Sequence, residues 1–271
     1  MLQEKGLDAT AAWAQQNGFS SVEFLQLPID NWHRGVDSLP QAATIRKRLL
    51  DFGLTTACYS VGVNLLEGKS AIEFLKRNAE LAAELGSPFL HHTLIDSLTL
   101  PSNAPSFAEV FPQILDTASE IARYCQSLGL TCLYEEQGLY FNGIEPFRRF
   151  FDEIKQRCPN VGICGDFGNI LFADESPTTF FNTFLSDIKH VHIKDYQKAS
   201  ANDTPTVQDG WLQTKNGTYI KDVPLGEGIV DAAACLQILK KANYQGVFSL
   251  ELVAPTVNNP SAMQLIKKLF I

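Results

Sequence analysis

Amphipathic helix patterns alternate with short apolar runs along the chain. Three early helical patterns end at Gly18, Gly53 and Gly86, and a short apolar run follows each of these glycines. A glycine directly after the last periodic residue is typical of a left-handed helix cap. The pattern therefore predicts a repeating unit, a helix followed by a strand.

Seven such units can be counted, and one more helical pattern, residues 261–270, follows them. The apolar runs predicted as strands are SVEFL from Ser21, TTACY from Thr55, FLHHT from Phe89, TCLYE from Thr131, VGICGD from Val161, IKHVHI from Ile188 and GVFSLEL from Gly246. Such units imply parallel strands joined by right-handed crossovers, and about eight of them close into a barrel. We predict an α/β fold, a (β/α)8 TIM barrel, with residues 1–271 as a single domain. Only MLQEKGL, residues 1–7, is left for the first strand, so that strand is predicted to be short or missing.

An open doubly wound sheet is the competing fold for this alternation. It is disfavoured because no glycine-rich phosphate loop of the GxGxxG or GxxxxGK type follows any of the apolar runs. A length of 271 residues also suits one barrel.

Composition and charge narrow the classes of partner. The net charge is −8 and there is no basic stripe, which argues against nucleic acid and favours a small-molecule substrate. The six cysteines form no CxxC pair, which is typical of reduced thiols in a cytoplasmic protein. The first ten residues are unlike a signal peptide and no long uncharged apolar run occurs, so we expect no membrane association.

Polar residues mark the ends of several predicted strands, where a barrel builds its active site. These residues are His91, His92, Glu135, Glu136, Asp166, His192 and Glu251. Two glutamates, an aspartate and a histidine from different strand ends can converge on one point. Glu135 and Glu136 are adjacent and face opposite ways, so only one of them can point inward. Three carboxylates and one imidazole suit a divalent Mn, Mg or Co ion better than structural Zn, which prefers thiolates.

Six segments, in their order and spacing, resemble the motifs of one known family. They are AELAAELGS, GLTCLYEEQG, VGICGDFGN, HVHIKD, LGEGIVD and FSLEL. The family is that of the xylose isomerase-like TIM barrels. It includes sugar and sugar-phosphate isomerases and epimerases, inosose dehydratases and apurinic endonucleases.

The resemblance implies a set of metal ligands. These are Glu135, Asp166, His192 and Glu251. Glu135 is preferred to Glu136 because it lies six residues after Gly129, as in the family pattern. His190, on the same strand face as His192, is expected to be a packed, hydrogen-bonded residue.

Further polar residues are predicted to contact substrate. They are His92, Asn169, Lys194 and Trp211. Asn169 stands where the family has a histidine, and it can donate a hydrogen bond but cannot titrate near neutrality. Lys194 and Asp195 begin the next loop, where they either orient a ligand or pair with each other. The polar segment around Trp211, residues 208–220, is long enough for a lid.

The resemblance and these residues indicate a divalent-metal-dependent isomerase or epimerase of a sugar, sugar acid or sugar phosphate. A metal ion would stabilise an enediolate as a Lewis acid, while Glu135 and Glu251 remove and return the proton next to the carbonyl. A dehydratase (lyase) of inosose or dehydroshikimate type would share the first step and is the alternative. A DNA repair nuclease is disfavoured, since five histidines are too few for a cluster of zinc ions. A noncatalytic sugar-binding protein and a homo-oligomer both stay open.

Overall fold

The chain divides into two compact units. The computed structural model describes residues 2–26, 36, 38–96, 103–138, 140–200, 203–251, 264–265 and 267–269. Unit 1 comprises residues 1–141 and 148–162, and unit 2 comprises residues 142–147 and 163–271. Within these described ranges, no helix combines the length and the apolar character that a membrane span requires.

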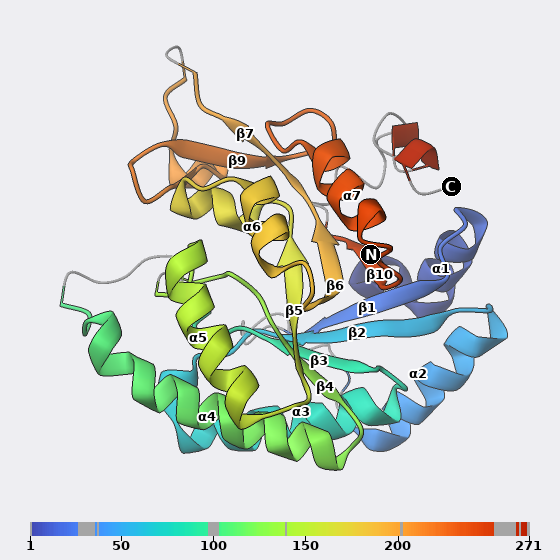
Figure 1. The fold of residues 1–271 in the computed structure, drawn as a ribbon. Helices are drawn as coiled ribbons and strands as arrows, with labels where there is room; N and C mark the ends of the chain where they lie inside the picture. The colour runs from blue at the N-terminus through green and yellow to red at the C-terminus, as the bar shows by residue number, and fades with distance from the viewer. Residues whose placement is uncertain are drawn as a thin grey trace. The chain divides into compact units, whose positions relative to one another are not determined.

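Unit 1 repeats the predicted succession of helix and strand. Its elements are α1 (Leu2–Gln16), β1 (Ser21–Gln26), α2 (Leu39–Asp51), β2 (Thr55–Val61), η1 (Leu65–Glu67), α3 (Lys69–Glu84), β3 (Phe89–His92), α4 (Phe107–Ser127), β4 (Thr131–Tyr134) and, from its second turn on, α5 (Ile144–Arg157). Strands β1 to β4 are parallel and lie in chain order. Helices α2, α3 and α4 lie side by side along this sheet (Figure 1).

Unit 2 combines parallel strands with an antiparallel insertion. Its elements are β5 (Val161–Asp166, whose first two residues belong to unit 1), η2 (Asn169–Ala173), α6 (Pro177–Phe184), β6 (Ile188–Ile193), β7 (Asp195–Lys198), η3 (Val207–Asp209), β8 (Leu212–Gln213), β9 (Tyr219–Val223), α7 (Ala232–Lys241) and β10 (Val247–Leu250). Strands β5, β6 and β10 are parallel neighbours in that order. Strands β7, β9 and β8 form a separate antiparallel sheet.

Helix α3 illustrates how the sequence pattern produces this architecture. Ala71, Leu75, Ala79 and Ala82 are buried and recur every three or four residues, so one stripe of the helix packs on the sheet. Gly86 follows with φ +75°, as the sequence predicts for a cap. The other two predicted cap glycines, Gly18 and Gly53, also have positive φ, and so does Gly129 after α4.

Several predictions from the sequence can be compared with the structure. Residues 2–7, the only candidates for the first strand, lie in helix α1, which is interrupted by a kink at Gly6 (φ 77°, ψ 170°), so that strand is missing among the described residues. The polar segment after β6, predicted as a loop, instead supplies the antiparallel sheet. The last predicted helix, residues 261–270, falls partly outside the described residues, although 264–265 and 267–269 are helical. All six cysteines are buried and none forms a disulfide, as expected of reduced thiols.

Candidate functional site

Three ionisable residues of unit 2 follow or end neighbouring parallel strands. Asp166 is the last residue of β5, His192 lies near the end of β6, and Glu251 directly follows β10. The strand register pairs Asp166 with His192, and His192 with Ser249, two residues before Glu251. The parallel register therefore brings the three side chains to the same carboxyl edge.

The three residues offer a compact set of metal-ligating atoms. One ligand atom from each of Asp166, His192 and Glu251 lies within 4.8 Å of the other two. His192 Nδ1 is 3.1 Å from Glu251 Oε2 and 4.0 Å from Asp166 Oδ2. Two ligands of one divalent ion, each about 2.1 Å from it, lie at most about 4.2 Å apart. The donor types and these spacings fit a divalent cation.

Asp166 is fixed by the turn that follows its strand. Its side chain is fully buried, and its Oδ1 accepts hydrogen bonds from the backbone N–H groups of Gly168 and Asn169, both at 2.7 Å. Backbone donors of this kind stabilise the ionised carboxylate. Asp166 is therefore held with its second oxygen directed to the cluster.

Lys194 supplies a positive charge to the same cluster. Its Nζ lies 2.9 Å from Glu251 Oε2 and 3.1 Å from Asp166 Oδ2, and it donates to Asn169 Oδ1 at 3.1 Å. Burial raises the pKa of Glu251, but the charge of Lys194 and the hydrogen bond with His192 outweigh it and lower that pKa. Glu251 is thus held as a carboxylate.

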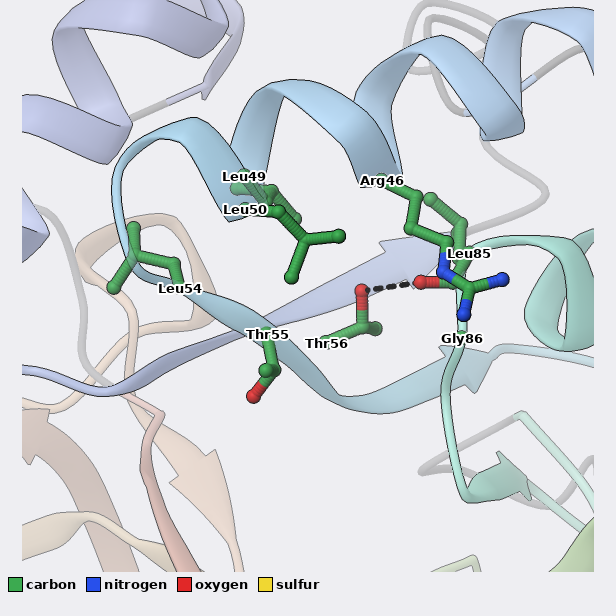
Figure 2. A pocket seen from close by; sticks show the side chains of 8 residues that line it. All are labelled: Arg46, Leu49, Leu50, Leu54, Thr55, Thr56, Leu85 and Gly86. Carbon is green, nitrogen blue, oxygen red and sulfur yellow. Dashed lines mark hydrogen bonds between the residues drawn. The ribbon is translucent and has the colours of Figure 1, made fainter.

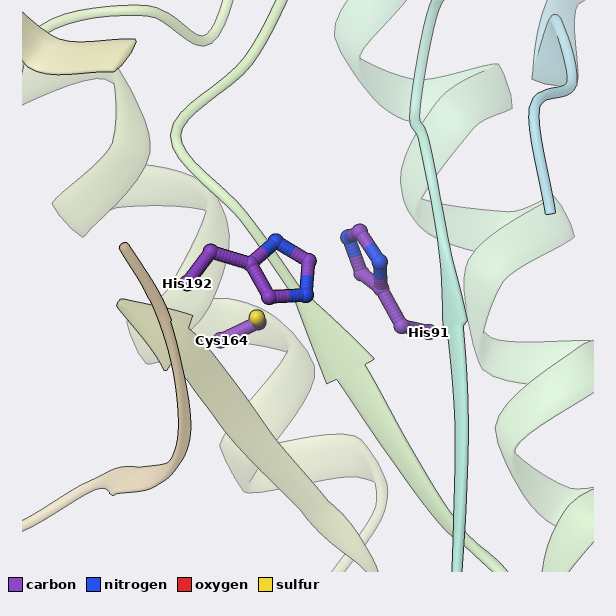
Figure 3. Close-up of side chains that lie close together, drawn as sticks. All are labelled: His91, Cys164 and His192. Carbon is purple, nitrogen blue, oxygen red and sulfur yellow. The ribbon is translucent and has the colours of Figure 1, made fainter. Parts of the chain in front are cut away.

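Two buried residues of unit 2, His190 and Cys164, lie close to His192. His190 is fully buried, and its Nε2 lies 3.0 Å from Ser249 Oγ, which confirms the expected packed and hydrogen-bonded role. The His190 and His192 rings meet edge to face at 5.3 Å. Figure 3 shows the thiol of Cys164, from β5, next to the His192 ring.

Unit 1 carries its own polar chain at the ends of its strands. Glu135 directly follows β4 and is buried, and its Oε2 lies 3.8 Å from His91 Nε2. His91 Nδ1 is 2.9 Å from Ser60 Oγ, which donates to Glu23. Ser60 is not among the candidate site residues predicted from the sequence. Its place near the carboxyl end of β2 is the signal that could have identified it.

His92, adjacent to His91 on β3, is fully buried, and its Nδ1 lies 2.9 Å from the Thr93 carbonyl oxygen. Its ring meets Tyr134 edge to face at 5.2 Å. Burial, together with the nearby His91, lowers the pKa of His92 to about 4, although the hydrogen bond to Thr93 opposes this shift. His92 is therefore neutral at physiological pH, and its contact with substrate stays a prediction.

The free energy of unfolding is expected to fall as the pH drops from about 6.5 towards 4. In the unfolded chain His92 has a pKa near 6.5 and is protonated below that pH, whereas in the folded chain it is protonated only below about pH 4. The loss attributable to His92 is about 3 kcal/mol. Urea denaturation of the wild type and of His92→Gln across this range measures it. An identical pH dependence in both proteins would contradict this assignment.

The side chains of Lys194 and Asp195 have different partners. Lys194 pairs with Asp166 and Glu251, whereas the Asp195 carboxylate accepts hydrogen bonds from four backbone N–H groups. The donors are those of Tyr196, Gly226, Gly228 and Val230. Asp195 thereby connects the start of β7 to the turn at residues 226–228, here called the GEG turn. Of the two alternatives for these residues, pairing with each other is wrong, and the orientation of a ligand stays a prediction.

Trp211 lies in the antiparallel insertion rather than in a simple loop. It is buried, with 9% of its surface exposed, and the Lys221 ammonium lies 5.9 Å from its ring centroid. The predicted substrate contact of Trp211 stays a prediction.

Glu136, the neighbour of Glu135, is fully buried.

A cavity of about 110 Å³ opens at the opposite edge of the unit 1 sheet (Figure 2). Thr55 and Thr56 from the start of β2 line it, whereas Glu135 and His91 lie at strand ends. Its other lining residues are Arg46, Leu49, Leu50, Leu54, Leu85 and Gly86. With one cation and no acid, this cavity lacks the donors of the candidate site.

Comparison with known proteins gives matches over nearly the whole chain. An inosose dehydratase of Bacillus cereus (strain AH820) is 23% identical over 246 residues, which cover 86% of this chain and 81% of that protein. The crystal structure of a 3-keto-D-glucoside 4-epimerase from E. coli superposes with a TM-score of 0.71 at 17% identity, covering 98% of this chain and 94% of that one.

A TIM barrel protein from Mycobacterium smegmatis, solved in complex with magnesium, has a TM-score of 0.69 at 15% identity. The match covers 97% of this chain and 89% of that one. At such identities the solved structures show a shared fold, which is the predicted TIM barrel. A family model described as the xylose isomerase-like TIM barrel matches residues 11–269. This chain therefore belongs to the xylose isomerase-like TIM barrel family.

Proposed function

We propose that this chain is a divalent-metal-dependent isomerase or epimerase of a sugar, sugar acid or sugar phosphate. The observation that carries the proposal is the set of Asp166, His192 and Glu251, whose ligand atoms lie within 4.8 Å of one another. Glu135 completes the proposed ligand set, as the family resemblance implies. Mn, Mg or Co suits these donors better than Zn.

The bound ion would supply Lewis-acid stabilisation of negative charge on the substrate oxygens. The chain supplies the proton transfers. Glu251, which Lys194 and His192 keep ionised before the ion binds, is proposed to remove the proton next to the carbonyl. Glu135, protonated from solvent, would donate a proton either to the opposite face of the same carbon for epimerisation or to the neighbouring carbon for isomerisation, and Glu251 would release the proton it took to solvent.

Polar side chains around these acids would orient the substrate. Lys194 and Asn169 are hydrogen-bonded to each other, and Lys194 also contacts both acids of unit 2, so a substrate oxygen near them would meet an N–H donor. His92 and Trp211 are proposed as further contacts. The substrate in this proposal is a small sugar or polyol derivative.

A dehydratase of inosose or dehydroshikimate type is the second candidate. It is favoured by the curated inosose dehydratase that matches 86% of this chain. The two candidates share the removal of a proton next to a carbonyl and differ in the next chemical step. In the dehydratase, the electron pair left on carbon expels a β-hydroxyl group as water instead of taking the proton back.

Solvent exchange and product analysis test the proposal. Metal-loaded protein is incubated in D₂O with ketoses, inososes and sugar acids in turn. We expect deuterium in the carbon next to the carbonyl of an isomerised or epimerised product. A product that has lost water and absorbs in the ultraviolet would establish the dehydratase instead. If no compound exchanges deuterium or reacts, a noncatalytic sugar-binding protein becomes the better account.

A further inference from the structure

Lys194 occupies the position of a cation between the acids of the proposed metal site. Its Nζ contacts Glu251 Oε2 at 2.9 Å and Asp166 Oδ2 at 3.1 Å, and only 5% of the residue is exposed. The oxygens that Lys194 contacts are the same ones that His192 Nδ1 approaches. An ammonium therefore already neutralises the two carboxylates that a divalent ion would use.

The fold holds Lys194 in this place from several sides. Asn169 Oδ1 accepts from its Nζ at 3.1 Å. The next residue, Asp195, is anchored by backbone donors on the GEG turn, such as Gly226 N and Gly228 N at 2.9 Å and 3.0 Å. This anchoring fixes the backbone from which the lysine side chain extends.

Gly168 gives the lysine stem its room. A Cβ atom at Gly168 would lie 2.8 Å from Lys194 Cγ and 2.5 Å from Tyr196 Cε2, closer than side chains tolerate. The absence of a side chain at Gly168 thus lets the stem of Lys194 run against the turn that also caps Asp166. Three segments of unit 2 therefore fix the position of the ammonium. They are the turn at residues 168–169, the start of β7 and the GEG turn.

Two cations cannot use the same carboxylate oxygens without strong repulsion. Opposite charges near 3 Å attract strongly in a partly buried site, and like charges repel equally strongly. A lysine that loses its acid partners in a buried site would also leave its own charge uncompensated. A divalent ion that binds Asp166 and Glu251 must therefore displace the Lys194 ammonium from them.

We propose that Lys194 is a resident counter-cation, which holds Asp166 and Glu251 when no metal is bound and competes with the divalent ion for them. This inference rests on the proposed metal-dependent function. It gives Lys194 a role in setting metal affinity, in addition to the proposed contact with substrate. Asn169 Oδ1 already accepts a hydrogen bond from the Lys194 ammonium, and it would remain a partner after the ion has displaced Lys194 from the two carboxylates.

Calorimetric titration with Mn²⁺ tests the competition. Lys194→Met keeps the length of the side chain and removes its charge, and we expect it to bind Mn²⁺ at least about tenfold more tightly than the wild type. Lys189→Met is the matched control, because Lys189 lies on the same strand and is exposed. It changes the net charge equally, and its Mn²⁺ affinity should stay within about twofold of the wild type.

The outcomes separate this inference from the proposed function. Equal Mn²⁺ affinity in the wild type and Lys194→Met would overturn the competition and leave the metal site standing. No Mn²⁺ binding by either protein would overturn both. If Lys194→Met does not fold, amine acylation of the wild type followed by mass spectrometry decides. Saturating Mg²⁺ should speed acylation of Lys194 severalfold and leave Lys189 unchanged, and an unchanged rate at Lys194 would overturn the inference.

Discussion

Glu251→Gln is expected to lower kcat by at least about 10³-fold while the fold stays intact. The amide keeps the size of the side chain, but it cannot take a proton from carbon and is a poorer ligand for a divalent ion. Lys194 and His192, which contact Glu251 Oε2 at 2.9 Å and 3.1 Å, would also lose a charged partner. Steady-state kinetics on the substrate found by solvent exchange measures the loss.

Glu153→Gln is the control for this variant. Glu153 is exposed on α5 of unit 1, so the substitution removes the same charge without touching the site. We expect wild-type kcat from Glu153→Gln and wild-type circular dichroism from both variants. Full activity in Glu251→Gln would remove Glu251 from the mechanism.

Asp166→Asn is expected to weaken Mn²⁺ binding at least about 100-fold and to lower the free energy of unfolding by about 3 kcal/mol. The Asn oxygen can still accept from the N–H groups of Gly168 and Asn169, but its amide nitrogen would face the Lys194 ammonium. A buried cation would thus lose one of its two acid partners. Calorimetry with Mn²⁺ and urea denaturation measure the two effects.

Asp152→Asn, an exposed change on α5, serves as the control and should alter neither quantity. Unchanged stability in Asp166→Asn would mean that Lys194 does not depend on this carboxylate. Unchanged Mn²⁺ affinity would exclude Asp166 as a ligand.

Much of the architecture could be predicted from periodicity and glycine positions. Each predicted strand is present, because a short apolar run after a helix cap has few other ways to bury its side chains. The antiparallel sheet of β7, β9 and β8 could not be predicted, since Leu212–Gln213 and Tyr219–Val223 alternate too briefly within polar sequence. The placement of residues 2–7 in the kinked helix α1 could not be predicted either, because the sequence is only weakly apolar there.

The candidate site was predictable in its residue types and less so in its contacts. Parallel strands place Asp166, His192 and Glu251 at one edge, so their positions near strand ends were enough to group them. The contact of Lys194 with two of these acids depends on the room at Gly168, which no spacing of residues reveals. The approach of His91 to Glu135 likewise depends on tertiary packing.

The proposed function requires a divalent ion bound by four side chains at the ends of separate strands. Crystals grown with Mn²⁺ and measured near the manganese absorption edge test this directly. We predict one anomalous peak within coordination distance of Glu135, Asp166, His192 and Glu251. An empty site at saturating Mn²⁺, or a peak held by other residues, would contradict the proposed metal site.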